Sequence, residues 1–404
     1  MSRTISLILL VAAMATSGTL AGDWRQFRGP DGTGISDETG LPTMLEARKN
    51  IAWKAALPGR GLSSPIIVSD RIFVTASSGG QNERLHVLCF NASDGTLRWE
   101  RQFWATGRTI CHDKISVAAP TPVSDGERLF ALFSSNDLIC LDRDGNLVWL
   151  RGLMRDYPNA SNSLGMSTSP VVADGVLIVQ TETDGDSFVA GIDALTGINR
   201  WKIPRTKRAN WSSPIILRGA AGKLLVGLQS GAGLSALEPG TGREAWKYAD
   251  GASTMPSSVA QGDTLFVPSR GITALQISSS GESPKQLWRA SQLRPATASP
   301  LVLGNQIIVL NDADVLTSGD TDTGNRRWQL RLKGPISASP VSASGYLYFV
   351  SEKGVIQVVD PSGEEGRVIS ELDLGEVFIG TPSIGQGALY VRSDGHLWKI
   401  SNRR

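Results

Sequence analysis

Short apolar runs separated by turn residues recur along the chain, most clearly between residues 167 and 203. This stretch contains four runs, at Pro170–Ala173, Val176–Thr181, Phe188–Asp193 and Ile198–Ile203, and Asp-Gly or Thr-Gly pairs separate most of them. Such pairs between apolar runs are typical of hairpin turns, so the stretch predicts four antiparallel strands. One small sheet cannot bury both of its faces, and it therefore needs copies of itself on either side.

The chain repeats this unit eight times. We place the openings, typically Ser or Thr followed by Pro, at Pro65, Pro122, Pro170, Pro214, Pro256, Pro300, Pro340 and Pro382. Most units close on Gly-x-x-x-Trp, and the closing tryptophans are Trp99, Trp149, Trp201, Trp246 and Trp328, with Trp288 ending a stretched fifth unit. The seventh unit has Ser370 at this position, and the eighth stops after three strands. Eight four-stranded units therefore need one more strand from elsewhere.

That strand is expected at residues 51–57, which carry Trp53 but follow no earlier strands of a unit. If it pairs with the last unit, the ring of sheets closes and no open sheet edge remains. The sequence thus predicts an all-β, eight-bladed β-propeller of four-stranded antiparallel blades over residues 51–404. We expect each closing Trp to wedge between adjacent blades, which buries its ring.

The repeated opening with Ser-Ser-Pro and closing with Thr-Gly-x-x-x-Trp resembles the pyrroloquinoline-quinone (PQQ)-type β-propeller repeat. The family includes quinoprotein alcohol dehydrogenases, the outer-membrane assembly lipoprotein BamB and many exported bacterial proteins. The stretch DWRQFRGPDGTGISDETGLP at 23–42 is similar to the last group. In the dehydrogenases of this family a vicinal disulfide covers the quinone, and carboxylate and amide side chains hold Ca²⁺ beneath it.

The N-terminal 50 residues divide into two parts. Residues 1–21 have a positive start at Arg3, an apolar core and small residues before Ala21, a pattern typical of a signal peptide. We therefore expect export to the periplasm or the extracellular space after cleavage near Ala21, with no membrane span in the mature chain; an uncleaved anchor is the alternative. Residues 22–50 are irregular and are expected to pack on the propeller through Trp24 and Phe27.

Two connections between consecutive units are unusually long. Trp99 to Pro122 spans 23 residues and Trp149 to Pro170 spans 21, against 10–13 for the others. Long loops on a rigid scaffold are where binding residues concentrate. Counted over the connections of that face, nine residues are basic and four acidic. We therefore predict a positively charged cup over blades 1–3 that binds an anionic small ligand or an acidic protein partner.

The candidate binding residues lie in or beside these loops. They are Arg60, Arg108, His112, Asp113, Lys114, Arg155, Asn162, Arg205, Arg208, Asn210 and Trp211. His112 beside Asp113 is either a general base with its orienting carboxylate or, as we favour, a structural or surface histidine. Trp211 either stacks on a flat ligand or, as we favour, packs into the channel or between blades.

Composition narrows the function without naming it. A formal charge of +2 with no long basic run argues against nucleic acid as a partner, and we expect a monomer. Cys89, Cys111 and Cys140 are an odd number with no adjacent pair; Cys89 and Cys140 are expected to pack as small apolar groups. We expect no PQQ, Ca²⁺ or other metal site. The main hypothesis is a non-catalytic binding or scaffold propeller, with a PQQ-dependent dehydrogenase, a BamB-like assembly factor and a carbohydrate- or peptide-binding module as alternatives.

Overall fold

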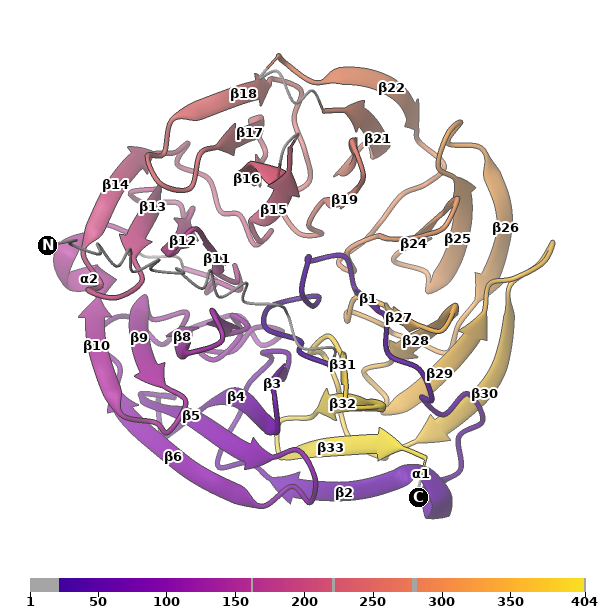
Figure 1. The fold of residues 1–404 in the computed structure, drawn as a ribbon, viewed down its shortest axis with the longest axis horizontal. Helices are drawn as coiled ribbons and strands as arrows, with labels where there is room; N and C mark the ends of the chain where they lie inside the picture. Colours follow the sequence, from indigo (N-terminus) through magenta and orange to yellow (C-terminus); the bar gives the residue numbers. More distant parts are fainter. Residues whose placement is uncertain (1–21, 161–162, 220–221, 278–281, 403–404) are drawn as a thin grey trace, which may run out of the picture.

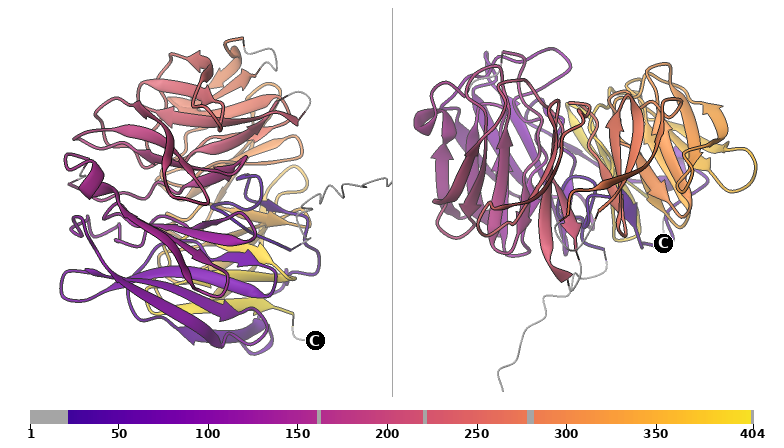
Figure 2. Two further views of the ribbon diagram at one scale, coloured as in Figure 1. Left: turned by 60° about the vertical axis from the view of Figure 1, so that its left-hand side comes forward. Right: turned by 90° about the horizontal axis from the view of Figure 1, so that it is seen from above.

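Eight antiparallel sheets stand around a central axis in the computed structural model, which describes residues 22–160, 163–219, 222–277 and 282–402 (Figure 1). Seven sheets have their four propeller strands in sequence order from the axis outward, and one of these has a fifth strand added on its inner side; in the eighth sheet an N-terminal strand takes the outer position. The predicted eight-bladed propeller is confirmed. Seen from the side, the blades twist from one face of the disc to the other (Figure 2).

The first four blades follow one another without interruption. Blade 1 contains β3 (Ile66–Val68), β4 (Arg71–Ser78), β5 (Arg84–Asn91) and β6 (Leu97–Trp104); blade 2 contains β7 (Val123–Ser124), β8 (Arg128–Leu132), β9 (Asp137–Asp142) and β10 (Leu147–Gly152). Blade 3 contains β11 (Val171–Ala173), β12 (Val176–Thr181), β13 (Phe188–Asp193) and β14 (Asn199–Pro204); blade 4 contains β15 (Ile215–Arg218), β16 (Leu224–Ser230), β17 (Gly233–Leu237) and β18 (Glu244–Tyr248). The short helix α2 (Leu153–Asp156) lies in the connection between blades 2 and 3.

The other four blades complete the ring. Blade 5 contains β19 (Val259–Gln261), β20 (Thr264–Ser269), β21 (Gly271–Gln276) and β22 (Lys285–Ala290); blade 6 contains β23 (Leu301–Leu303), β24 (Gln306–Leu310), β25 (Val315–Asp320) and β26 (Arg326–Arg331). Blade 7 contains β27 (Val341–Ala343), β28 (Tyr346–Val350), β29 (Val355–Asp360) and β30 (Arg367–Asp373). Blade 8 contains β31 (Ser383–Gly385), β32 (Ala388–Arg392) and β33 (His396–Ser401), and β2 (Ile51–Ala56) is its outer strand.

The chain closes its own ring through β2. This strand follows the short helix α1 (Ala47–Asn50) and pairs antiparallel with β33, from Ile51 opposite Ile400 to Ala56 opposite His396. The predicted closure is therefore confirmed. At the end of the pairing, Lys54 Nζ lies 2.7 Å from Glu376 Oε1, in the connection that leads into blade 8. The closing strand is thus bound to blade 8 by backbone hydrogen bonds and to the preceding connection by an ion pair.

The repeat tryptophans form the predicted wedges. Trp99 Nε1 donates to the carbonyl of Arg143 in blade 2 at 3.0 Å, and Trp149 Nε1 donates to that of Ala194 in blade 3 at 3.1 Å. Trp53, Trp201 and Trp288 make equivalent bonds to the next blade, and Trp246 and Trp328 are almost fully buried. Each hydrophobic core cluster accordingly contains strands of neighbouring blades.

Residues 23–36 cross the central channel. Trp24 is fully buried and exchanges two backbone hydrogen bonds with Ile67 of blade 1, at 2.8 and 2.9 Å. On the far side of the channel β1 (Ile35–Ser36) pairs in parallel with β27 of blade 7. Between these two attachments, Arg28 is buried and donates to the carbonyls of Thr33, Ser258 and Pro300. The segment and the C-terminal strand lie toward the same face of the disc (Figure 2).

Two details of the sequence interpretation need correction or comment. Pro256 does not correspond to the other opening prolines. In blades 4 and 6, the serine that hydrogen bonds to the neighbouring blades stands directly before the opening proline, as Ser213 and Ser299 do. In blade 5 the equivalent serine is Ser257, which stands after Pro256. The unit therefore has Ser258 where the others have Pro.

Cys89, Cys111 and Cys140 are free. Cys89 and Cys140 are buried in the blade cores as predicted, and burial raises the pKa of each thiol to about 12.

Candidate functional site

A cavity of about 390 Å³ lies on the propeller axis, and we call it the central funnel. Phe27, from the crossing segment, lies against it, so the segment closes one end of the channel. Its walls come from the connections between blades, including Ile115, Leu164, Met255 and Ile379, and from the residues just before each inner strand. No Asp or Glu is among the described residues that line it. The site is therefore a blind cup that all eight blades help to build.

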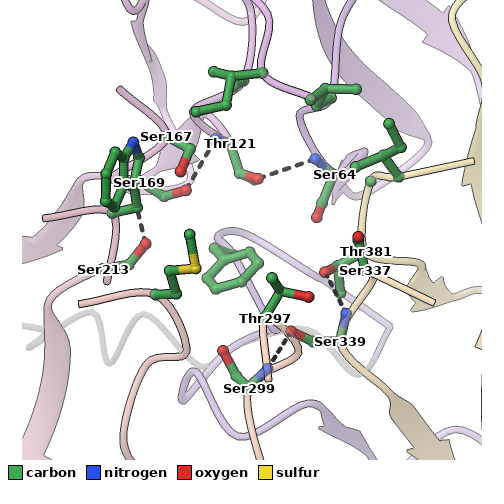
Figure 3. A pocket seen from close by; sticks show the side chains of 18 of the residues that line it. Ser64, Thr121, Ser167, Ser169, Ser213, Thr297, Ser299, Ser337, Ser339 and Thr381 are labelled. Carbon is green, nitrogen blue, oxygen red and sulfur yellow. Dashed lines mark hydrogen bonds between the residues drawn. The ribbon is translucent and has the colours of Figure 1, made fainter. Parts of the chain in front are cut away.

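A ring of hydroxyl groups, one from each blade, surrounds the funnel, and Figure 3 labels all of its members except Ser257. Its members are Ser64, Thr121, Ser169, Ser213, Ser257, Ser299, Ser339 and Thr381. The backbone N–H of each member from Ser64 to Ser339 donates to the side-chain oxygen of the next, at 2.9–3.1 Å. The ring thus joins neighbouring blades and places eight hydroxyl groups against one cavity.

The ring is open at one position. Among the described residues nothing donates to Ser64 Oγ or accepts from it, although this side chain is 1% exposed. The backbone N–H of Thr381, which would continue the pattern by donating to Ser64, has no acceptor among the described residues. The gap falls between blades 8 and 1, where β2 closes the propeller. A buried hydroxyl group without a partner is unfavourable, so this point is the natural place for a ligand atom or a water.

Three of the predicted site residues line the funnel. Trp211 forms part of the wall; its Nε1 donates to the carbonyl of Gly165 at 2.9 Å, which fixes the ring. His112 and Lys114 lie at the rim and are exposed. The backbone N–H of Lys114 donates to His112 Nδ1 at 3.1 Å, and no contact joins the Asp113 carboxylate to this ring among the described residues. The arrangement supports a surface histidine rather than a base oriented by Asp113.

The predicted positive cup also contains carboxylates that the prediction did not count. The connections were counted without the hairpins between second and third strands, which share the same face and supply carboxylates. Arg60 pairs with Asp394 at 3.4 Å and Lys114 with Glu352 at 3.3 Å. Arg205 pairs with Glu182 at 2.6 Å and Lys207 with Asp186 at 2.8 Å. Most of the expected excess charge is therefore neutralised within the molecule.

The remaining candidates are dispersed. Arg108, Arg155 and Arg208 are exposed and do not line the funnel, and Asp113 accepts a hydrogen bond from Arg60 through its backbone carbonyl. Asn210 is buried and donates to Glu182 Oε2 at 2.9 Å and to the carbonyl of Gln229 at 2.7 Å. With Arg205 it satisfies the buried Glu182, which indicates a structural cluster between blades 3 and 4. Asn162 lies outside the described residues.

Sequence reasoning missed the hydroxyl ring. The signal for the ring was present, because Ser or Thr precedes the proline at most openings, but it served only to count blades. Phe27 was predicted as an anchor on the propeller, but its place at the end of the channel was not, since that place depends on the attachments of Trp24 to blade 1 and of β1 to blade 7.

A second group of reactive side chains lies in blade 1. Ser78 Oγ is 2.7 Å from His86 Nε2, and His86 Nδ1 is 2.6 Å from Glu100 Oε1. These distances match a serine–histidine–carboxylate arrangement. His86 is only 2% exposed and lies between β4 and β6, and none of the three residues lines the funnel. Both ring nitrogens are satisfied within the sheet, so the group accounts for a buried histidine.

The donors at the funnel do not match a metal-bound quinone. Carboxylates are absent from its described lining, and the described residues contain no group of three or more His, Cys, Asp or Glu placed to hold a metal ion. Hydroxyl groups and carbonyls alone lack the anionic oxygens that Ca²⁺ sites use. Cys89 and Cys140 lie in the cores of different blades and cannot form a vicinal pair over the cavity.

In the described part of the chain, no helix is long and apolar enough to span a bilayer.

Comparison with known proteins agrees with the fold. A family model described as outer membrane protein assembly factor BamB matches residues 35–163, 104–259, 232–335 and 313–404, which together extend over most of the chain. The chain belongs to this family. It is a PQQ-like, BamB-like propeller repeat protein, as the resemblance of its repeats predicted.

Two curated proteins are distant relatives of this chain. BamB of Moranella endobia is 25% identical over 182 residues, which cover 44% of this chain and 42% of that protein. Polyvinylalcohol dehydrogenase of a Pseudomonas species is 25% identical over 187 residues, covering 42% of this chain and 27% of that enzyme. The match thus spans less than half the length of either relative.

Solved structures share the architecture at low identity. BamB from Moraxella catarrhalis has a TM-score of 0.64 at 16% identity, covering 87% of this chain and 97% of that one. A europium-containing methanol dehydrogenase has a TM-score of 0.73 at 13% identity, covering 95% and 98%. An outer membrane protein assembly factor and a methanol dehydrogenase therefore share this scaffold, and the fold alone does not separate them.

Proposed function

We propose that this protein is a non-catalytic binding propeller that holds a small ligand in the central funnel. The observation that carries the proposal is the blind cup on the axis, lined by hydroxyl groups from all eight blades and by Trp211. A pocket of this size with apolar walls and a few convergent polar groups is typical of a ligand site. Because seven of the eight hydroxyl groups accept a hydrogen bond from a neighbouring blade, most of the site is formed before the ligand arrives.

The funnel can be filled without disturbing the ring. Thr297 lines the cavity, is exposed, and its side chain makes no hydrogen bond to another described residue. Replacing it in Thr297→Trp should therefore fill the space that the ligand needs without breaking the ring. Thr206→Trp is the matched control, because Thr206 is also exposed but lies outside the funnel. After incubation with a small-molecule extract of the host, native mass spectrometry should show a retained ligand on the wild type and the Thr206→Trp variant only. A ligand retained equally by Thr297→Trp would reject the funnel as its site.

We propose further that the funnel works without PQQ or Ca²⁺, which the absence of carboxylates among its described lining residues supports. Purified protein mixed with both should show neither quinone absorbance after gel filtration nor reduction of an electron-accepting dye with alcohols, including polyvinyl alcohol. Stoichiometric retention of quinone together with dye reduction would place the protein with the dehydrogenases instead.

Export is part of the proposal. Residues 1–21 lie outside the described residues, and their composition supports a signal peptide. The N-terminus of the mature protein should therefore lie near Gly22, in the periplasmic or extracellular fraction, as N-terminal sequencing can measure. A mature chain that begins at Met1 and sediments with membranes would support the anchored alternative.

A BamB-like role in outer-membrane protein assembly is the second candidate, favoured by the family match. Here the protein would dock another protein rather than a small ligand. Cross-linking in the host followed by affinity purification distinguishes the two: outer-membrane assembly components recovered in constant ratio would favour the second role, and their absence would remove it.

A further inference from the structure

We infer that the ligand presents an oxyanion, a carboxylate or a phosphate, to the hydroxyl ring at the gap between Ser64 and Thr381. This inference rests on the proposed function and adds the chemistry of the ligand. It depends on how the hydrogen-bonding capacity of the ring is used, and on the charges around the funnel.

Most hydroxyl groups of the ring accept a hydrogen bond but do not use their own proton within the described protein. From Thr121 to Thr381, each side-chain oxygen accepts a backbone N–H, and none of these hydroxyl groups donates to any described residue. A hydroxyl group that accepts one hydrogen bond is a better donor for the next, because the bonds polarise one another. Each of these hydroxyl groups therefore keeps a proton that no described residue accepts, and acceptor-rich groups fit such a ring best.

The gap is the strongest point of the ring for an anion. Ser64 Oγ is buried with no partner, lines the funnel and points toward its interior in Figure 3. The backbone N–H of Thr381 has no acceptor among the described residues. One O–H and one N–H are thus available together, and two such donors can serve the two oxygens of a carboxylate or of a phosphate.

The charges nearest the funnel favour a negative ligand. No described lining residue is acidic, but Lys114 at the rim is paired with Glu352, which also accepts a hydrogen bond from the lining residue Ser337, so Lys114 adds little net charge. On the side of the crossing segment, the buried Arg28 donates to the carbonyls of Ser258 and Pro300, the residues that follow ring members Ser257 and Ser299. No carboxylate pairs with this guanidinium in the described part of the chain. A positive charge without a counter-ion therefore lies just behind the ring.

Outside the ring, polar side chains share the wall of the cavity with an apolar part. Leu62, Trp211, Met255 and Ile379 form walls that offer a flat ring face and flexible hydrocarbon rather than further hydrogen bonds. The ligand that fits is consequently a small organic acid or phosphate ester with an apolar, preferably aromatic, body.

Matched probes test the inference by isothermal titration calorimetry on the mature chain. The probes are 2-naphthoate, 2-naphthyl phosphate, 2-naphthamide and 2-naphthylmethylammonium, which share one ring system and differ in the polar group. We expect the two anions to bind at least about tenfold more tightly than the amide and the cation not to bind. Whichever anion binds more tightly identifies the oxyanion as carboxylate or phosphate.

The variants locate the contact. Ser64→Ala should weaken the anions about three- to tenfold without lowering the thermal midpoint, because Ser64 Oγ makes no hydrogen bond within the described protein. Ser64→Thr should retain binding, and Ser291→Ala, which removes an exposed hydroxyl group outside the funnel, should change nothing.

The outcomes separate the two proposals. Equal affinity for naphthoate and naphthamide, or no binding of any probe, would overturn the oxyanion inference, while a ligand displaced by Thr297→Trp would still support the funnel. Anion binding that Thr297→Trp leaves unchanged would place the probes elsewhere and contradict both.

Discussion

The contact between Gly95 and Trp53 tests how the closing strand is fixed. Gly95 lies in the turn between β5 and β6 with φ +74°, a left-handed conformation that disfavours any side chain. A Cβ there would meet Cδ2 and Cε3 of Trp53, on β2, at 2.7 Å. Ordinary carbon contacts lie at about 3.5–4.0 Å, so Gly95→Ala must displace the Trp ring or the strand that carries it.

The size of the effect follows from a matched control. Gly345 has φ +82° and nothing within 4 Å of its would-be Cβ, so Gly345→Ala reports backbone strain alone. That strain costs about 1–2 kcal/mol, and the loss of freedom in the unfolded chain offsets about 0.4–1 kcal/mol of it. Overpacking against Trp53 adds about 1–3 kcal/mol for Gly95→Ala only.

Urea unfolding followed by far-UV circular dichroism measures both variants. We expect similar slopes, a slightly lowered midpoint for Gly345→Ala and a clearly lower one for Gly95→Ala. If the two midpoints coincide, the Trp wedge does not limit the packing of the closing strand, and the explanation of the Gly-x-x-x-Trp pattern fails.

Three further predictions concern titratable and reactive groups. Burial opposes ionisation of Glu376, but hydrogen bonds from Lys54, Ser393 and His396 outweigh it and lower the pKa of this carboxyl group from 4.5 to about 2. Because the pKa in the folded state is depressed, ionised Glu376 stabilises the fold fully above about pH 4.5, and this stabilisation is lost as the pH falls toward 2. Glu376→Gln should flatten the fall in unfolding free energy over that window, and an unchanged slope would contradict the assignment. Because burial raises the pKa of Cys89 and Cys140 to about 12, a thiol reagent at pH 8 should modify only Cys111 in the folded protein and all three in urea; rapid modification of three thiols without urea would show that the blades open. His86 is buried between strands, so a fluorophosphonate should not label Ser78, and labelling that His86→Ala abolishes would instead reveal a hydrolase.

Features that repeat in the sequence were predictable, because each copy makes the same contact. Trp99 and Gly145 recur at one spacing since each ring packs on the glycine turn of the next blade, and that contact can be inferred from the spacing alone. The strand at 51–57 was recognisable because the last unit is one strand short. Repetition thus revealed the fold and its closure.

Features that occur once were not predictable in the same way. The place of Phe27 depends on backbone pairing of its neighbours with blades 1 and 7, which no local pattern encodes. The carboxylates of the loop face were not counted because Glu182 and Glu352 reach it from hairpins inside the blades, and only the geometry shows that they meet Arg205 and Lys114. The hydroxyl ring was visible as residues but not as a set of unused donors.

The pairing of β2 with β33 also sets the order in which the protein can mature. During synthesis β2 is made before any blade, yet its partner β33 follows only after the seven other blades. Until then residues 51–56 have an unsatisfied edge, and every blade formed in between belongs to an open arc. The growing chain therefore needs protection from neighbouring copies, and loss of β33 would leave the ring open, with unpaired strand edges on β2 and β32.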